Sequence, residues 1–369
     1  MKLLAVELVD FRNLALARVE PHPRFNVFVG DNGQGKTNLL EAIFLVGTLA
    51  SFRASRLDEL VRFSTLRAQA RARVERAGLE RLYEVEISSL PTRKLARVDG
   101  KAVRATADYF GGFNVVLFAP EDLTLPRGAP NARRRFLDRA VWNAEPALLR
   151  EAQIYGRLLK SRNALLRDGG PRMGELLDVY DVQLAAAGAA IVVRRRRFLG
   201  ALAPRVAVAW ERITGSGLPL EVAYRSALSG SDGELGAELL SALGRTRGGD
   251  CARGFTSAGP HADDLELLID GRPARSFGSQ GQLRALVLAL KIAEIQHLEA
   301  VLGEPPILLL DDVSSELDPA KSAFLFSFLA DLACQVFLTT TDARHVLFDG
   351  ARSVFQVAAG ELFEAPQSR

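Results

Sequence analysis

Eight consecutive residues near the N-terminus have the types and spacing of a phosphate-binding loop. They fit the pattern G-x-x-x-x-G-K-[ST] and read Gly30, Asp31, Asn32, Gly33, Gln34, Gly35, Lys36 and Thr37. Glycines let backbone N–H groups approach phosphate oxygens, and the start of a following helix adds partial positive charge. In such a loop the lysine reaches the β and γ phosphates of a nucleotide, and the last hydroxyl ligates Mg²⁺. The sequence therefore predicts bound ATP and Mg²⁺; the plainer alternative is a glycine-rich turn with a solvated Lys36.

Two neighbouring carboxylates end an apolar run later in the chain. Residues 306–310 have the composition of a buried strand, and Asp311 and Asp312 follow them. Like charges side by side repel each other, so such a pair is unusual unless a cation or a reaction uses it. We expect Asp311 to hold Mg²⁺ together with Thr37, and Asp312 to orient or deprotonate the attacking water. Lys36, Asp311 and Asp312 are thus the catalytic candidates, and a helix N-cap is the alternative for the two acids.

A short polar segment lies about 30 residues before the acidic strand. Ser279, Gly281 and Gln282 stand at the start of a long apolar helical pattern. Their spacing resembles the signature motif of ATP-binding-cassette ATPases, in which the serine and its helix contact the γ-phosphate held by a second subunit. Residues 315–318 resemble the D-loop of the same class, which adds Asp318 to the nucleotide-binding candidates. The alternative for Ser279 is a plain helix N-cap.

Composition and charge limit the class of protein. The 369 residues are 48% hydrophobic and 25% charged, which is ordinary for a globular protein and excludes disorder throughout the chain. We find no run of about 18 apolar residues and no signal peptide, so we expect a cytoplasmic protein without a membrane span. Two cysteines and four scattered histidines do not suffice for a disulfide framework or a metal site.

The net charge of +3 hides a strongly basic middle of the chain. Residues 125–212 hold 17 Lys and Arg against 8 Asp and Glu, whereas the rest of the chain has 30 against 36. Helical spacing predicts two long helices here, about 131–167 and 173–213, with a kink or break at Pro204. Residues 229–250 are rich in Gly and Ser and predict a loop.

Runs of arginine in these two helices are candidates for contacts with DNA phosphates, because guanidinium pairs well with phosphate. The candidates are Arg133, Arg134, Arg135, Arg194, Arg195, Arg196 and Arg197. Consecutive residues point around a helix, so we expect one or two of each run to face DNA. A solvated helix face is the alternative for each of them.

Strand and helix patterns on both sides of the basic stretch predict an α/β fold. Strands are expected at 3–10, 25–29, 113–118, 264–269, 307–310 and 335–339, and helices from Lys36 and over 281–302 and 320–332. Short strands alternate with turns over 66–104, including a type I′ hairpin turn at 98–101. These patterns predict an ATPase-like core built from residues 1–125 and 255–369. The resemblance of the motifs to those of ATP-binding-cassette ATPases implies an ABC-type ATPase head, with a mixed sheet around a P-loop core. Residues 126–254 would form an inserted helical lobe that resembles a short coiled coil.

Together these motifs resemble the RecF family of bacterial DNA-repair ATPases, over essentially the whole chain. The resemblance rests on residues 11–13, 30–38, 118–123, 133–138, 259–265, 279–282 and 308–318. It implies an ATP-dependent homodimer that binds duplex DNA next to single-stranded gaps and works with RecR and RecO to load RecA. It also implies weak ATP hydrolysis that resets the protein, and a nucleoid-associated place in the cytoplasm. Arg12 and Asn38 join the nucleotide-binding candidates on this basis.

Three positions depart from the pattern of the wider class. Thr341 stands where many relatives carry a histidine, Asp312 replaces a more common glutamate, and Pro120 or Glu121 replaces a glutamine. We therefore expect a slow switch rather than a motor. His261, which could be taken for a catalytic base, is expected to have a structural role in a loop.

Two other functions remain open at this point. A nucleotide-binding subunit of a membrane transporter would carry the same three ATP motifs, and it would co-purify with a membrane partner. An ATP-regulated scaffold for RecR-like partners would bind little DNA by itself. DNA affinity that falls steeply with salt would separate the DNA-binding protein from the scaffold, because phosphate contacts release counterions.

Overall fold

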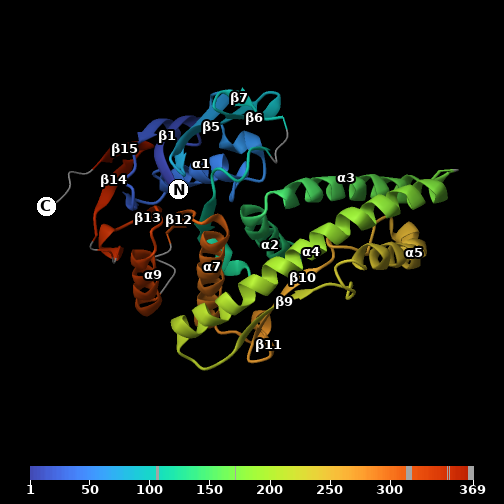
Figure 1. Cartoon of the computed structure of the whole chain (residues 1–369). Helices are drawn as coiled ribbons and strands as arrows, with labels where there is room; N and C mark the ends of the chain where they lie inside the picture. Colours follow the sequence, from blue (N-terminus) through green and yellow to red (C-terminus); the bar gives the residue numbers. More distant parts are fainter. Residues whose placement is uncertain (105–107, 171, 313–317, 347, 349, 365–369) are drawn as a thin grey trace. The chain divides into compact units, whose positions relative to one another are not determined.

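The computed structural model describes residues 1–104, 108–170, 172–312, 318–346, 348 and 350–364 (Figure 1). The chain divides into two compact units, which we describe separately. Unit 1 combines Met1–Thr124 with Leu290–Arg369, and unit 2 is Leu125–Ala289. Residues 255–289, expected in the ATPase core, therefore belong to unit 2.

A mainly parallel sheet lies at the centre of unit 1. Its strand order is β15 (Glu361–Glu364), β14 (Arg352–Ala358), β3 (Phe25–Val29), β13 (Val336–Thr340), β12 (Ile307–Asp311) and β8 (Val115–Phe118). All neighbours pair in parallel except β14 and β15, which are antiparallel. The residues of β3, β13, β12 and β8 are all buried, as expected for parallel strands covered on both faces. Because β13 lies between β3 and β12, the segments that follow β3 and β12 meet at one edge of the sheet.

An antiparallel sheet forms the second layer of unit 1. Its strand order is β2 (Leu14–Val19), β1 (Lys2–Phe11), β4 (Arg67–Arg76), β5 (Leu79–Ser89), β6 (Thr92–Val98) and β7 (Lys101–Ala102). The predicted type I′ turn between β6 and β7 is confirmed, since Asp99 and Gly100 have φ values of 51° and 74°. Helix α1 (Lys36–Thr48) contacts strands of both sheets, and the apolar core of unit 1 surrounds it.

The remaining elements of unit 1 are helical. They are η1 (Leu57–Leu60), η3 (Pro120–Thr124), α9 (Pro319–Asp331) and η4 (Ala343–His345). Helix α7 (Gln280–Leu302) begins in unit 2 and ends in unit 1. The predicted strands at 25–29, 307–310 and 335–339 and the predicted helices from Lys36, over 281–302 and over 320–332 are confirmed to within one residue at each described end.

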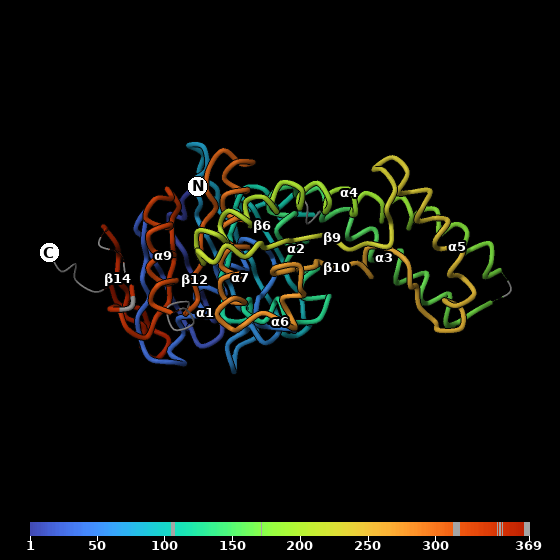
Figure 2. Tube along the Cα trace, turned by 90° about the horizontal axis from the view of Figure 1, so that it is seen from below, coloured from blue at the N-terminus to red at the C-terminus, as the bar shows by residue number. Residues whose placement is uncertain are grey.

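Unit 2 is mainly helical, with one small sheet (Figures 1 and 2). Its elements are α2 (Pro130–Ala144), α3 (Ala147–Asp168), α4 (Met173–Thr214), β9 (Leu220–Arg225), α5 (Leu235–Arg253), β10 (Asp264–Ile269), β11 (Arg272–Pro273) and α6 (Ala274–Phe277). Helix α4 contacts α3 and α5, and β10 pairs with both β9 and β11. The pairing of β10 with β9 ties residues 255–289 to this unit.

Two predictions for this unit are wrong. The helix expected over 131–167 is two helices, because Pro146 lacks an N–H and disfavours helical geometry at Glu145, whose φ is −133°. The stretch expected to be a loop at 229–250 contains most of α5. Leu235, Leu239 and Leu243 recur every four residues and are fully buried, so packing overrides the weak helix propensity of the neighbouring glycines.

The helix expected over 173–213 is confirmed as α4. The break that was one of the two outcomes expected at Pro204 does not occur, since the helix continues through this residue. By length and composition alone α4 could cross a membrane, although no membrane span was predicted. Core helices of soluble proteins meet the same criteria. Leu184, Ile191 and Leu202 of α4 are buried within the folded chain.

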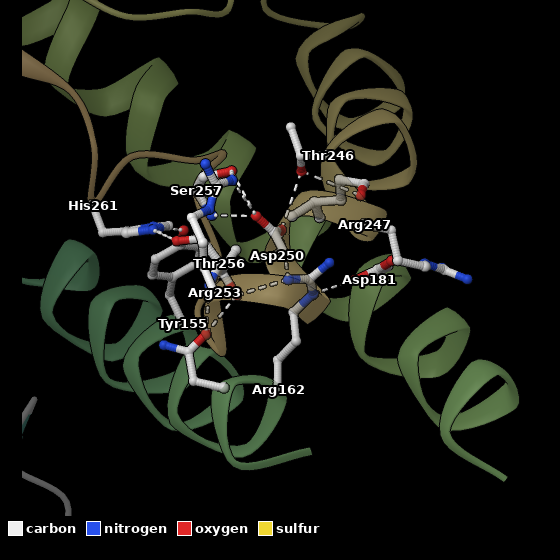
Figure 3. Close-up of polar contacts among 12 residues, drawn as sticks. Tyr155, Arg162, Asp181, Thr246, Arg247, Asp250, Arg253, Thr256, Ser257 and His261 are labelled. Carbon is white, nitrogen blue, oxygen red and sulfur yellow. Dashed lines mark hydrogen bonds and ion pairs between the residues drawn. The ribbon is translucent and has the colours of Figure 1, made fainter. Parts of the chain in front are cut away.

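A buried arginine joins three helices of unit 2. The Arg162 side chain on α3 donates from Nε to Asp181 Oδ1 at 2.6 Å and from Nη1 to Asp250 Oδ2 at 3.0 Å. It also donates to Thr256 Oγ1 at 2.8 Å, in the loop that follows α5 (Figure 3). The side chains of all three charged residues are at most 1% exposed. Burial acts to raise the pKa of Asp250, but hydrogen bonds from Ser257, Arg162 and Thr246 outweigh it and hold that pKa below its ordinary value.

His261 lies in the same loop and has a structural environment, as expected. Its Nδ1 is 2.6 Å from the hydroxyl of Tyr155, and its Nε2 is 2.9 Å from the carbonyl oxygen of Thr256. Burial lowers the pKa of His261, which favours the neutral imidazole between these two partners. The loop is thereby fixed to α3, where Tyr155 is buried.

We predict that Arg162→Ala lowers the free energy of unfolding by about 3 kcal/mol, because it removes a charge partner from two buried carboxylates. Urea unfolding followed by circular dichroism measures this change. Arg157→Ala is the matched control, since Arg157 is exposed on the same helix. The control should change stability by less than about 0.5 kcal/mol. Equal losses in both variants would show that the buried ion pairs contribute nothing specific.

Candidate nucleotide site

The backbone of the phosphate loop requires glycine at three positions. The loop connects β3 to α1, and Gly33 and Gly35 have φ values of 81° and 118°. Side chains other than glycine rarely adopt these angles. A Cβ atom on Gly30 would lie 2.2 Å from the carbonyl oxygen of Val357 in β14, so the loop packs closely against this strand.

Lys36 is buried at the centre of the loop. Its Nζ donates to the carbonyl oxygens of Gly30 at 2.5 Å and Asp31 at 2.8 Å. Burial lowers the pKa of Lys36, and the nearby carboxylates of Asp312 and Asp311 oppose this effect. A phosphate group in the loop would place a full negative charge beside the Lys36 ammonium, whereas the backbone carbonyl groups carry only partial charge.

Thr37 and Asp311, the two expected ligands of Mg²⁺, lie together. The Thr37 hydroxyl donates to Asp311 Oδ1 at 2.8 Å, although the residues are 274 positions apart. Thr339 at the end of β13 donates to the same oxygen, also at 2.8 Å. Burial raises the pKa of Asp311, while the two hydroxyl groups act in the opposite direction. A carboxylate and a hydroxyl are hard oxygen ligands of the kind that Mg²⁺ prefers, so the residues fit this ion.

A cavity of about 190 Å³ opens beside these residues. Its lining consists of Asn32, Gly33, Gly35, Lys36, Thr37, Asn38, Arg53, Asp312 and Thr339. The structure thus places Asp312 at the same cavity as the phosphate loop. Asp312 has a φ of 47°, and its backbone N–H donates to the Thr339 hydroxyl at 2.9 Å.

Sequence reasoning missed Thr339 and Arg53. Thr339 lies in a strand that was predicted, but only the strand order shows that its hydroxyl reaches Asp311. Arg53 lies outside any recognisable motif, and its Nη1 donates to Asn38 Oδ1 at 3.2 Å. No local signal in the sequence could have found either residue.

Gln34 and Asn38, expected to bind nucleotide, have side chains engaged with the protein. The backbone carbonyl oxygen of Gln34 accepts hydrogen bonds from Asn13 Nδ2 and the Gly360 N–H, both at 3.0 Å. The side-chain oxygen of Gln34, Oε1, accepts a hydrogen bond from the N–H of Ala359 at 2.6 Å, in the turn between β14 and β15. Asn38 Nδ2 donates to Asn13 Oδ1 at 2.7 Å. Gln34 therefore fixes the loop to the C-terminal hairpin, and Asn13 links the loop to the β1–β2 turn.

Arg12 lies outside the lining of the cavity. Its Nε and Nη2 donate to the two carboxylate oxygens of Glu41 on α1, each at 2.9 Å. Glu41 is fully buried and also accepts from the Ser51 hydroxyl at 2.5 Å. This bidentate pair fixes the β1–β2 turn to α1, next to the Asn13 contacts.

The signature residues form a capping box at the start of α7, in unit 2. The Ser279 N–H donates to Gln282 Oε1 at 2.9 Å, and the Gln282 N–H donates to the Ser279 hydroxyl at 3.2 Å. The alternative interpretation of Ser279 as an N-cap is therefore correct in this structure. Ser279 and Gly281 are also exposed, so the helix start is open to a ligand. Arg127 donates to the carbonyl oxygen of Gly278 at 3.3 Å and supports the segment before the helix.

Residues 313–317, which contain most of the expected D-loop, lie outside the described part of the chain. Asp318 is described and forms the N-cap of α9, where its carboxylate accepts from the Lys321 N–H at 3.0 Å and pairs with the Lys321 ammonium. These contacts lower the pKa of Asp318. Thr341 is exposed directly after β13, and Pro120 and Glu121 open the short helix η3 after β8.

Similarity to known proteins agrees with this geometry. Residues 2–361 match the family model described as the RecF/RecN/SMC N terminal domain. The chain is 50% identical over 352 residues to the DNA replication and repair protein RecF of Anaeromyxobacter dehalogenans (strain 2CP-C), covering 93% of each chain. It is 42% identical over 367 residues to RecF of Geobacter sulfurreducens, covering 98% of this chain and 99% of the relative. The chain belongs to the RecF family.

Solved structures extend this result to the fold. A structure of the recombination mediator protein RecF with ATP, in the RecFOR pathway, superimposes with a TM-score of 0.90 at 31% identity. It covers 99% of this chain and 98% of the solved one. An Smc head structure has a TM-score of 0.57 at 14% identity and shows the shared fold alone. The predicted ABC-type ATPase head is therefore confirmed.

The candidate DNA-binding arginines divide into inward and outward groups. Arg133 and Arg195 are buried, and each forms a bidentate ion pair, with Asp264 and Asp138 respectively. Arg194 pairs with Glu145 and Glu151. Arg134 and Arg196 donate to backbone carbonyl groups. In the described part of the chain, Arg135 and Arg197 are exposed without such a partner, so DNA contact by these runs remains a prediction for those two residues.

We predict that Thr339→Val weakens Mg²⁺-dependent ATP binding about tenfold, because it removes one of the two hydroxyl groups that orient Asp311. Titration with a fluorescent ATP analogue, in Mg²⁺ or in EDTA, measures the effect. Binding in EDTA should change little. Thr340→Val is the matched control on the next position of β13, which faces the other side of the sheet. An equal loss in EDTA would contradict a role for Thr339 in the metal site.

We predict that Gln282→Ala lowers the free energy of unfolding by about 0.5–1 kcal/mol, whereas Gln282→Glu leaves it unchanged. Glutamate can accept the same hydrogen bond from the Ser279 N–H and preserve the capping box. The midpoint of urea unfolding measures the difference. Equal losses in the two variants would show that the capping box does not stabilise α7.

Proposed function

We propose that this chain is an ATP-dependent DNA-binding protein of recombinational gap repair and replication maintenance. The observation that carries the proposal is the contact of Thr37 with Asp311 beside the phosphate loop, in a chain that belongs to the RecF family. That contact brings the expected ligands of Mg²⁺ together with a lysine suited to the β and γ phosphates. The relatives are DNA replication and repair proteins, and a solved relative was obtained with ATP.

In the proposed cycle each residue has a limited task. The loop amides and Lys36 bind the phosphates, and Thr37 and Asp311 would hold Mg²⁺, which neutralises phosphate charge when bound. Asp312 orients the attacking water. Ser279 and the exposed start of α7 meet the γ-phosphate bound by a second copy of the chain, so ATP favours the homodimer. Slow hydrolysis then ends the dimer.

The proposed dimer forms a clamp on duplex DNA next to single-stranded gaps, and it acts with RecR and RecO to load RecA. This places the protein in the cytoplasm, with the nucleoid. The transporter alternative loses its support, because the relatives of Anaeromyxobacter dehalogenans and Geobacter sulfurreducens, which match 93% of the chain or more, are RecF proteins. The DNA-binding experiment described next also tests the scaffold alternative.

We predict cooperative binding of a labelled duplex with ATP, and much weaker binding with ADP or without nucleotide, because dimerisation requires the γ-phosphate. Fluorescence anisotropy against protein concentration measures this. Equal binding in all three states would contradict the ATP switch. Absence of binding in every state would favour the scaffold.

Ser279→Arg is the control variant for this experiment. Its bulky cation blocks the approach of a second copy, whereas Lys36, Thr37 and Asp311 remain intact. We expect it to bind ATP like the wild type and to stay monomeric in sedimentation velocity. ATP-dependent dimers of this variant would contradict the proposed role of Ser279.

A further inference from the structure

Four cations of helix α3 are exposed to solvent, whereas many arginines of unit 2 are engaged with carboxylates or carbonyl groups. Arg133, Arg162, Arg194 and Arg195 are engaged with carboxylates in the interior or at its margin. The four cations on the outer side of α3 are exposed, and in the described part of the chain they have neither a hydrogen bond nor an ion pair. They are Arg150, Arg157, Lys160 and Arg167. We call this set the α3 stripe.

The α3 stripe lies on one face of the helix. At 100° per residue, its members fall within an arc of about 100°, while the buried Leu148, Tyr155, Arg162 and Leu166 fall on the opposite side. The fifth buried residue, Leu149, falls at the edge of the arc, in the first turn and ahead of the stripe. The apolar side of α3 is thus occupied by the interior of unit 2, against α4 and α5. The face that carries the stripe contacts solvent.

Acidic side chains neutralise little of this face. Helix α3 contains two of them, Glu151 and Asp168. Asp168 falls within the arc, beside Arg167 at the last residue of the helix, and leaves the face with a net charge of about +3. Glu151 is engaged by Arg194, with Nε and Oε2 2.7 Å apart. By contrast, cations on the antiparallel sheet of unit 1 alternate with carboxylates, as where Arg71 pairs with both Glu7 and Glu84. The stripe is therefore a row of solvated charge rather than a set of ion pairs.

The stripe has the dimensions of a short length of duplex. From Arg150 to Arg167 the helix rises about 25 Å, at 1.5 Å per residue. This corresponds to about seven base pairs at 3.4 Å each. Long, flexible side chains in a straight row suit a regular array of phosphates, which needs no fixed geometry at any single contact. A helix that lies on a membrane would expose an apolar face, but that face of α3 is buried.

We propose that the α3 stripe binds the phosphate backbone of duplex DNA. This inference rests on the proposed function and adds the surface that carries out the binding. The contacts are electrostatic, independent of base sequence, and accompanied by release of counterions. The row follows the helix axis, so the duplex backbone runs along α3.

The test neutralises the stripe in the full-length protein. The variant carries Arg150→Gln, Arg157→Gln, Lys160→Gln and Arg167→Gln. The matched control removes the same charge from exposed positions elsewhere in unit 2, with Arg172→Gln, Arg212→Gln, Arg225→Gln and Arg245→Gln. Anisotropy of a labelled duplex with ATP is measured over a range of salt concentrations, and thermal unfolding confirms that both variants are folded.

We expect the stripe variant to lose about tenfold to hundredfold in affinity near 0.1 M salt, and its slope of log K against log salt to fall by about 3. The control should keep most of the wild-type affinity. A further variant, with the three arginines of the stripe changed to lysine, should retain the salt slope, because the charge remains. ATP binding should be unchanged in all variants.

Four outcomes would overturn the inference. Wild-type affinity in the stripe variant would place the DNA surface elsewhere, while the proposed function would stand. Equal loss in the control would show an effect of net charge alone. Loss of binding to phosphatidylserine vesicles without loss of DNA binding would assign the stripe to a membrane surface. A wild-type protein that binds no duplex would contradict the proposed function and this inference together.

Discussion

The hydrogen bonds that converge on the carboxylate of Asp311 are the interaction on which the candidate site depends. One comes from Thr37 in the first turn of α1 and one from Thr339 in β13, both at 2.8 Å to the same oxygen. A buried carboxylate is costly unless such donors or a cation compensate it. The three residues meet only because β13 lies between β3 and β12 with all strands parallel. Asp311 and Thr339 are paired positions of β12 and β13, and a shift of one residue in either strand would turn its side chain to the other face of the sheet.

The phosphate loop depends in turn on both ends of the chain. Gly30 packs against the backbone of Val357 in β14, and Gln34 is held by the turn that joins β14 to β15. On the other side, Asn13 of the β1–β2 turn bonds to the Gln34 carbonyl oxygen. The first and last strands of unit 1 thus surround a loop of eight residues and fix the positions of its amides. A rigid loop loses little entropy on binding, which favours phosphate affinity.

Arginine has two separate tasks in unit 2. Arg162 joins α3, α4 and α5 from within, with Asp181 and Asp250 as partners. Lys160, Arg157 and Arg167 lie within about one and a half turns of Arg162 on the opposite face of α3, and their cations contact water. The interior ion pairs hold the helices together and thereby fix the helix that carries the α3 stripe. Burial, rather than residue type, decides which task each arginine has.

The sequence by itself determined the features that depend on local chemistry. The phosphate loop, the buried strand that ends at Asp311, the start of α1 and the Asp99-Gly100 turn follow from residue types at fixed spacing, since backbone angles and periodicity act over a few residues. Tertiary structure decided the rest. Helix α5 forms because its leucines are buried, Gln34 turns toward the C-terminal hairpin, and Thr339 reaches Asp311 through the strand order. Within one run, Arg195 is buried and Arg197 is exposed. These outcomes depend on contacts between residues far apart in the chain, and no local pattern contains that information.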